Sequence, residues 1–196
     1  MRVIAGTLRS RTLQAPAGLA TRPTSDRLRE TLFNVLAPRI EGARFLDLFA
    51  GSGAVGIEAL SRGAAEVVFV EKAPQALKVL RANLSRLELS RGFRIISGSA
   101  GGSLRRWEWD AGFDLIFLDP PYDAADEYAD ILGWLGRRGA GLLAADGLVI
   151  AEHRRKERLE DEYGNLKRTR LLEQGDAALS FYGSHSQLAV GFQGKL

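Results

Sequence analysis

The sequence contains no cysteine, one methionine and two histidines among 196 residues. The lack of cysteine excludes disulfide bonds, thiolate nucleophiles, cysteine-ligated zinc and iron–sulfur clusters. No run of 18 apolar residues occurs, so we expect no membrane-spanning helix and no membrane partner. The first ten residues lack the apolar core of a signal peptide. We therefore expect a cytoplasmic protein without a bound metal and without an obligate protein partner.

What is present is an ordinary globular composition, with 45% hydrophobic and 26% charged residues. The length is close to that of one domain, and such a chain buries roughly 70% of its unfolded surface. We expect a basic N-terminal hairpin and helix appendage over residues 1–40 and a core over residues 41–196.

Positive charge is concentrated at the N-terminus, although the whole chain carries only +3. Residues 1–40 hold seven arginines against Asp26 and Glu30. This pattern suits a polyanion, whose phosphates attract arginine by charge and by forked hydrogen bonds. A second explanation stays open, because arginine outnumbers lysine throughout the sequence.

Strand and helix patterns alternate from about residue 44 to 152. Short β-branched or apolar runs predict strands at 44–49, 66–70, 93–96, 113–118 and 147–151. Apolar positions with helical period predict helices at 54–62, 74–87 and 124–135. This alternation indicates an α/β fold whose parallel sheet has helices on both faces. Ligands bind such sheets at the edge where the strands end.

The two ends of the chain have different patterns. Residues 1–21 predict a small hairpin, and 26–37 predict a helix that buries an apolar stripe and leaves Arg27, Arg29 and Glu30 more exposed. In the tail, strand-like runs predict a closing antiparallel pair. These runs cover 166–172, 178–182 and 187–192.

A glycine motif follows the first strand of the alternating region. Gly51, Gly53 and Gly56 form G-x-G-x-x-G, which lets backbone N–H groups approach a ligand at a helix N-terminus. Alone, the motif also suits a dinucleotide or a tight turn without a ligand.

Two carboxylates narrow the choice of ligand. Asp47 lies inside the first strand, where a buried carboxylate needs a partner. That partner can be the ammonium group of an amino acid, as in S-adenosylmethionine. Alternatively, the carboxylate caps a helix or forms a salt bridge. Glu71 ends the second strand 20 residues after Gly51, where it can accept both ribose hydroxyls, as in NAD proteins too.

The sequence Asp119-Pro120-Pro121-Tyr122 follows the predicted strand at 113–118. Its prolines fix the backbone and remove two N–H donors. The Asp119 carboxylate and the Pro120 carbonyl are then two acceptors for an exocyclic NH2 group, and Tyr122 offers a ring on which a base stacks. Holding the amine toward sp3 geometry points its lone pair at a methyl donor, so the reaction needs mainly positioning.

At these motifs the sequence resembles the amino-methylating class I S-adenosylmethionine-dependent methyltransferases, and more closely the RsmD family. Members of that family methylate a guanine N2 of 16S ribosomal RNA of the small subunit. The resemblance implies a Rossmann-like, mostly parallel seven-stranded sheet with an antiparallel C-terminal strand. It rests on the stretches 2–6, 22–36, 45–64, 69–74, 113–122 and 181–183.

The resemblance also implies roles for single residues, and S-adenosyl-L-methionine as the cofactor. The cofactor-binding set is Asp47, Phe49, Ala50, Gly51, Gly53, Glu71, Lys72, Ser99, Ala100 and Asp119. The catalytic set is Asp119, Pro120, Pro121 and Tyr122. The RNA-binding set is Arg2, Arg9, Arg11, Arg22, Thr24 and Arg27.

Two positions depart from the family pattern. Ser99 stands where related enzymes often have an aspartate for the adenine amine, and Ser10 stands where many have glycine. His153 and His185 lack metal-spaced partners, so we expect structural or surface roles for both.

The resemblance implies 16S rRNA, in an assembled or assembling small subunit, as the partner. The residues alone leave several other functions open. These alternatives are an adenine-N6 methyltransferase, a protein-glutamine N5 methyltransferase, an NAD-dependent oxidoreductase and a non-catalytic RNA-binding module.

Overall fold

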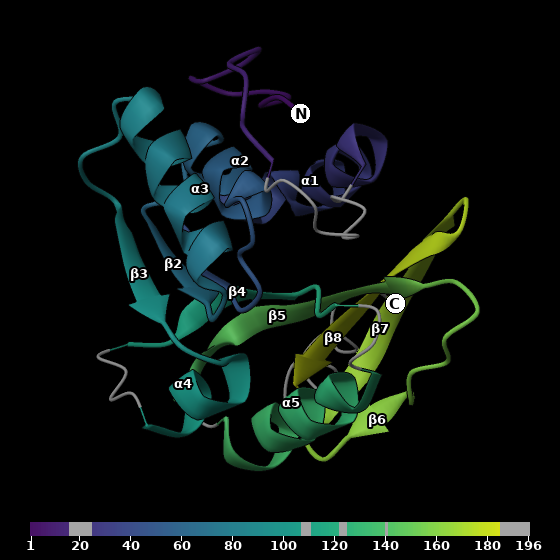
Figure 1. Ribbon diagram of the computed structural model, residues 1–196. Coiled ribbons are helices and arrows are strands. Elements are labelled where there is room, and N and C mark those ends of the chain that lie inside the picture. The colour runs from purple at the N-terminus through teal and green to yellow at the C-terminus, as the bar shows by residue number, and fades with distance from the viewer. Residues whose placement is uncertain (16–24, 107–110, 122–124, 140, 185–196) are drawn as a thin grey trace. The chain divides into compact units, whose positions relative to one another are not determined.

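The computed structural model describes residues 1–15, 25–106, 111–121, 125–139 and 141–184, and Figure 1 traces them from the N-terminus to the C-terminal strands. The chain folds into two compact units, Met1–Trp107 and Glu108–Leu196. The predicted boundary near residue 40 stays a prediction. Across the described ranges, no helix is both long and apolar enough to cross a membrane.

The first unit contains three parallel strands in the order β3-β2-β1. They are β1 (Arg44–Asp47), β2 (Glu66–Glu71) and β3 (Phe93–Ser97). β2 lies in the middle, and its four central residues are buried, as expected of a strand covered on both faces. Asp47 pairs in register with Phe69, and Glu71 with Ser97, so both carboxylates lie where a strand ends.

Four helices accompany these strands. They are α1 (Asp26–Ile40), α2 (Ala54–Ser61), α3 (Pro74–Arg86) and α4 (Ala100–Arg106). In Figure 1, α1, α2 and α3 lie on one side of the three strands and α4 on the other. The prediction of helices on both faces is therefore confirmed in this unit. α4 was not predicted, because its sequence AGGSLRR has two glycines, which lower helix propensity.

Ser25 caps the start of helix α1, because its hydroxyl accepts a hydrogen bond from the Leu28 N–H. Its apolar stripe is buried as predicted, and Arg27 and Glu30 are exposed. The expectation for Arg29 is wrong, because its side chain is fully buried. Its Nη2 group donates to the Arg2 carbonyl and to Asp26.

The N-terminal segment, residues 2–14, runs back along itself through one antiparallel bridge, Arg2 to Thr12. This agrees with the predicted hairpin over the residues described. Val3 and Leu13 are buried, so the segment packs by two apolar side chains. Polar side chains of α1, α2 and α3 also bind its backbone.

The described part of the second unit contains five strands in the order β4-β5-β8-β7-β6. β4 (Phe113–Leu118) and β5 (Leu143–Arg154) are parallel. β8 (Ala177–Ser184), β7 (Leu166–Gln174) and β6 (Glu162–Tyr163) continue as antiparallel neighbours. The predicted closing antiparallel pair is confirmed as β7–β8, and the predicted run at 187–192 lies outside the described residues.

One helix of the second unit is described, α5 (Ala125–Arg138). It lies close to β6 and β7, and the Gly136 carbonyl accepts a hydrogen bond from the Asn165 N–H at 2.9 Å. The structure thus contains eight strands over its described residues. Seven were expected, and the two-residue β6 is too short to leave a pattern in the sequence.

Candidate active site

The glycine loop connects the end of β1 to the start of α2. Gly51 and Gly53 have φ values of 54° and 82°, which glycine adopts without a Cβ clash. The Gly53 N–H donates to the Ala50 carbonyl at 2.7 Å, and the Ala50 N–H to the Val70 carbonyl at 3.0 Å. The loop is therefore a tight turn fastened to β2, as the motif predicts.

The second and third glycines also allow close packing. A Cβ on Gly53 would lie 2.4 Å from Leu80 Cδ1, and a Cβ on Gly56 would lie 2.3 Å from Phe69 Cε1. A Cβ on Gly51 would have no atom nearer than 3.9 Å. The space beside Gly51 is thus open, while Gly53 and Gly56 bring α2 against its neighbours.

Glu71 binds two backbone segments at once. Its Oε2 accepts the Gly51 N–H at 2.8 Å, and its Oε1 accepts the Ala73 N–H at 2.7 Å. The half-buried carboxylate therefore joins the glycine loop to the turn before α3. Each carboxylate oxygen has two lone pairs, so Glu71 can still accept the hydroxyls of a ribose.

Asp47 is buried, with 2% of its surface exposed. Its Oδ2 accepts the Gly56 N–H in the first turn of α2 at 3.3 Å. This is the helix-capping contact that the sequence left as one alternative. A negative charge at the end of β1 also remains suited to an ammonium group, because a carboxylate accepts several hydrogen bonds.

The remaining cofactor candidates of the first unit lie at the ends of β1, β2 and β3. Ala50 is buried, Phe49 is half-buried, and Lys72 is exposed. Ser99 is exposed, and its hydroxyl accepts the Gly102 N–H at 3.2 Å, whereas Ala100 is buried. The Ser99 hydroxyl therefore caps α4.

In the second unit, Asp119 follows β4 directly. Asp119 is half-buried, Pro120 is buried and Pro121 is exposed. Tyr122 lies outside the described residues. The predicted position of this turn at the end of a buried parallel strand is confirmed.

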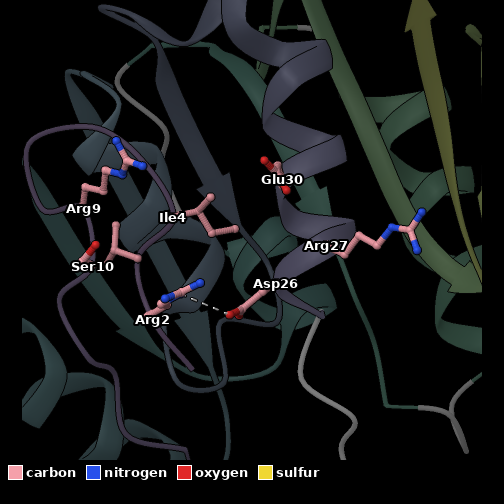
Figure 2. Close-up of a pocket in the computed structure, with 8 residues that line it drawn as sticks. Arg2, Ile4, Arg9, Ser10, Asp26, Arg27 and Glu30 are labelled. Atoms are coloured by element: carbon pink, nitrogen blue, oxygen red, sulfur yellow. Dashed lines mark ion pairs between the residues drawn. The ribbon is translucent and has the colours of Figure 1, made fainter.

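An open hollow of about 440 Å³ lies between the N-terminal segment and α1. In Figure 2, Arg9 and Ser10 stand across the hollow from Glu30, and Arg2 approaches Asp26. The Arg2–Asp26 ion pair measures 4.0 Å, and the Arg2 side chain is 71% exposed. Arg27 also lines the hollow, with its side chain directed away from the N-terminal segment. Arg2, Arg9 and Arg27 thus all line one hollow, with the Arg27 guanidinium pointing away from the other two (Figure 2).

The other RNA-binding candidates are placed elsewhere. Arg11 Nη2 donates to the Arg86 carbonyl at the end of α3, at 3.1 Å. Arg22 and Thr24 lie outside the described residues. Ser10 has a φ of 67°, a left-handed conformation that glycine adopts more easily, which accounts for the glycine that the family pattern has here.

Two buried polar residues beside the site were not predicted. Glu58 in α2 accepts the N–H groups of Ile4 and Ala5 at 2.7 and 3.0 Å, and it faces Arg29 and Arg62. Asn83 in α3 is fully buried. Each is a polar residue at a position where the pattern of its helix predicts an apolar one, and this mismatch is the feature of the sequence that could have identified both residues.

Titratable groups away from the site have structural roles. Burial lowers the pKa of the Arg29 guanidinium, and the carboxylates of Asp26 and Glu58 oppose that shift. His153 is buried and hydrogen-bonded to Ser180, which confirms its structural role. Among the residues that the structure describes, no group of three acidic or histidine side chains could hold a metal ion.

Comparisons with known proteins place this geometry in a family. The model of the family described as Conserved hypothetical protein 95 matches residues 1–183. The Escherichia coli (strain K12) protein named Ribosomal RNA small subunit methyltransferase D is 34% identical over 189 residues, covering 95% of this chain and 91% of that protein. YlbH of Bacillus subtilis (strain 168) is 38% identical over 93% of this chain and 98% of its own.

Solved structures agree with these matches. The structure of yhhF from Escherichia coli superposes with a TM-score of 0.80 at 33% identity, covering 95% of this chain and 99% of that chain. The SAH-bound methyltransferase PaMTH1 from Podospora anserina has a TM-score of 0.62 at 20% identity, over 80% of this chain and 78% of its own. This second likeness supports the fold alone.

Proposed function

The chain belongs to the Conserved hypothetical protein 95 family, the RsmD family, and from that membership we propose that it is an S-adenosylmethionine-dependent methyltransferase of small-subunit ribosomal RNA. Its target is the exocyclic N2 amine of a guanine in 16S rRNA. The observation that carries this proposal is the position of Asp119 and Pro120 directly after β4, in a chain whose glycine loop is bound by Glu71.

The first unit fits S-adenosylmethionine. Glu71 holds the Gly51 N–H and retains lone pairs for the two ribose hydroxyls. The open space beside Gly51 lets a ligand approach the backbone, and Asp47 provides negative charge for the ammonium group. Phe49, Ala50, Gly53, Lys72, Ser99 and Ala100 complete the proposed cofactor site.

Asp119, Pro120, Pro121 and Tyr122 form the proposed catalytic turn. When bound, S-adenosylmethionine supplies an electrophilic methyl group on a sulfonium sulfur. Asp119 and the Pro120 carbonyl accept the two N–H groups of guanine N2, and Tyr122 stacks on the base. These contacts would hold the N2 lone pair toward that methyl carbon, and the proton that N2 loses on methylation would pass to solvent.

The hollow between the N-terminal segment and α1 is the proposed RNA contact. Arg2, Arg9 and Arg27 line it, and arginine binds phosphate by charge and by paired hydrogen bonds. Arg11, Arg22 and Thr24 are proposed to extend this contact. A guanine N2 inside a base pair is out of reach, so the enzyme must take the base out of its stack.

Methyl transfer from labelled S-adenosylmethionine to small subunits that lack this modification tests the proposal, with nucleoside analysis of the product. We expect label in N2-methylguanosine. Label in N6-methyladenosine, or in protein glutamine, would move the enzyme to one of the two alternative methyltransferase classes. NADH binding without S-adenosylmethionine binding would indicate an oxidoreductase.

The variant Asp119→Ala separates catalysis from binding. We expect methyl transfer to fall by at least about a hundredfold, because a positioned polar group of this kind contributes about 10²–10³ in rate. RNA affinity should stay unchanged. Asp130→Ala, which removes an exposed carboxylate from α5, is the matched control and should retain full activity. Equal activity in both variants would remove Asp119 from the mechanism.

A further inference from the structure

Asn83 is a fully buried side chain on α3 that belongs to none of the predicted sets. Its Nδ2 group donates to the Ser52 carbonyl at 2.9 Å and to the Gln14 carbonyl at 3.0 Å. Its Oδ1 accepts the Gln14 N–H at 2.8 Å. Both donors and the acceptor of one amide group are therefore used by two separate stretches of backbone.

The two stretches belong to different proposed functions. Ser52 lies between Gly51 and Gly53, in the loop that we assign to the cofactor. Gln14 ends the N-terminal segment, whose Arg2 and Arg9 line the hollow that we assign to RNA. Asn83 is thus a direct connection between the cofactor loop and the RNA-contacting segment.

One planar amide cannot serve the two sides independently. Turning the amide to follow Ser52 also turns the donor and the acceptor that face Gln14. Asn83 is fully buried, so water does not replace a lost bond, and an unmade bond there costs the desolvation of the group. The positions of the Ser52 carbonyl and of the Gln14 backbone are therefore linked.

The far end of the segment is held to the same helix that follows the glycine loop. The Ile4 and Ala5 N–H groups donate to Glu58, and the Leu8 N–H donates to the Ser61 hydroxyl at 2.9 Å. Glu58 and Ser61 are both in α2, which begins directly after Gly53. The segment is therefore bound at one end to the helix that follows the glycine loop, and at the other end to Asn83, which binds the loop itself.

We propose that Asn83 is a positioning residue through which cofactor binding and RNA binding strengthen each other. The RNA half of this proposal rests on the proposed function. A ligand that orders the glycine loop fixes the Ser52 carbonyl and, through Asn83, the N-terminal segment. The first ligand to bind then loses the conformational entropy of ordering the loop and the segment, so the second ligand binds more tightly. Each ligand raises the affinity for the other by the same factor.

Two variants at one position test the connection. Gln14→Pro removes the N–H that Asn83 Oδ1 accepts, which is one of the two hydrogen bonds between Asn83 and residue 14, and it leaves the Asn83–Ser52 bond in place. Gln14→Ala removes an exposed side chain and keeps the N–H, so it is the matched control. Equal thermal unfolding midpoints of the two variants establish that both fold. If Gln14→Pro does not fold, Asn83→Asp, which removes both N–H donors of the amide, takes its place in the test.

The first measurement is hydrogen exchange of residues 2–14 with and without S-adenosylhomocysteine, in the absence of RNA. We expect the ligand to slow exchange in the wild type and in Gln14→Ala, but not in Gln14→Pro. Equal protection in all three proteins, or in none, overturns the proposal. This measurement does not depend on whether RNA is the substrate.

The second measurement is the dissociation constant of S-adenosylhomocysteine with and without saturating 16S rRNA transcript. We expect RNA to tighten ligand binding by about fivefold in the wild type and in Gln14→Ala, within the usual range of such couplings, and by less than about twofold in Gln14→Pro. Tightening that is the same in all three proteins overturns the role of Asn83. If the wild type does not bind the transcript but S-adenosylhomocysteine still slows exchange of residues 2–14, the proposed function is refuted and the Asn83 connection stands.

Discussion

Glu58 shows how one buried charge organises several elements. It is fully buried, it faces Arg29 Nε at 3.8 Å, and it accepts from Arg62 Nε at 2.8 Å. Arg29 is also fully buried, and its Nε and Nη1 make no hydrogen bond. Asp26 and Glu58 therefore together compensate a cation that has lost its water, Asp26 through a hydrogen bond at 3.0 Å and Glu58 through its charge.

Removing the Glu58 carboxylate is expected to lower the free energy of unfolding strongly. Glu58→Ala removes one of the two carboxylates that face the buried Arg29. It also removes the acceptor of the Ile4 and Ala5 N–H groups and of Arg62. Losing one partner of a buried ion pair typically costs about 3–5 kcal/mol of unfolding free energy. Glu66→Ala removes a half-exposed carboxylate that binds Arg44 and Arg94, and should cost no more than about 1 kcal/mol. Urea unfolding of both variants measures the difference, and equal losses would contradict the burial argument.

His153 predicts a pH dependence of stability. Its Nδ1 lies 2.9 Å from the Arg154 carbonyl and its Nε2 lies 2.9 Å from Ser180 Oγ. A carbonyl only accepts, so Nδ1 carries the proton and Nε2 accepts the Ser180 hydroxyl. Burial lowers the pKa of His153, against the opposing effects of the Arg154 carbonyl and Glu157.

The sign follows from proton binding in the two states. Below about pH 6.5 the unfolded histidine binds a proton and the folded one does not, so the free energy of unfolding falls as the pH drops toward the folded pKa. His153→Gln should lose less stability between about pH 7.5 and pH 5 than the wild type. Urea unfolding at both pH values measures this, and identical losses would show that His153 is not responsible.

At the scale of elements, the contact of α2 with β2 depends on Gly56. A Cβ there would lie 2.3 Å from Phe69 Cε1 and 2.8 Å from Val67 Cγ1. These neighbours are buried core residues, so they cannot move into solvent. The glycine spacing of the loop therefore serves helix packing as well as ligand approach.

Gly56→Ala should destabilise the protein by about 1–3 kcal/mol, because overpacked cores shift side chains and backbone. Adding Phe69→Leu should recover part of the loss by making room for the methyl group. A double-mutant cycle of unfolding free energies measures the coupling. Additive losses would mean that Gly56 and Phe69 do not meet.

The elements with a clear periodic pattern could be predicted from the sequence. The helix at 74–87 is observed as Pro74–Arg86, and the strand at 113–118 as Phe113–Leu118. α4 was missed because a seven-residue helix with two glycines has no amphipathic pattern. The extent of β5, from Leu143 instead of Gly147, depends on pairing with β4 and β8 and not on its own residues.

At the scale of the whole molecule, charge is the feature that bears on RNA. The chain has a net charge of only +3, but Arg2, Arg9 and Arg27 share one hollow. Arg9→Gln should weaken 16S rRNA binding and reduce the slope of log Kd against log salt by about 1. Arg155→Gln, an exposed arginine paired with Glu173, should leave the slope unchanged. A salt titration that gives equal slopes for both variants would exclude Arg9 from the RNA contact.

The sequence by itself determined the α/β class, the glycine loop after β1, the carboxylates at the ends of β1 and β2, and the position of Asp119 and Pro120 directly after β4. These follow from local period and spacing, because a strand, a turn or a motif is built from neighbouring residues.

Only the tertiary structure decided which distant residues meet. Arg29 is buried by partners on α2, Arg11 reaches the end of α3 instead of the hollow, and Asn83 contacts residues 69 and 31 positions away. No local pattern encodes such partners, because the contact exists only after the strands and helices have packed. The same packing places a lone asparagine of an apolar helix between the glycine loop and the N-terminal segment.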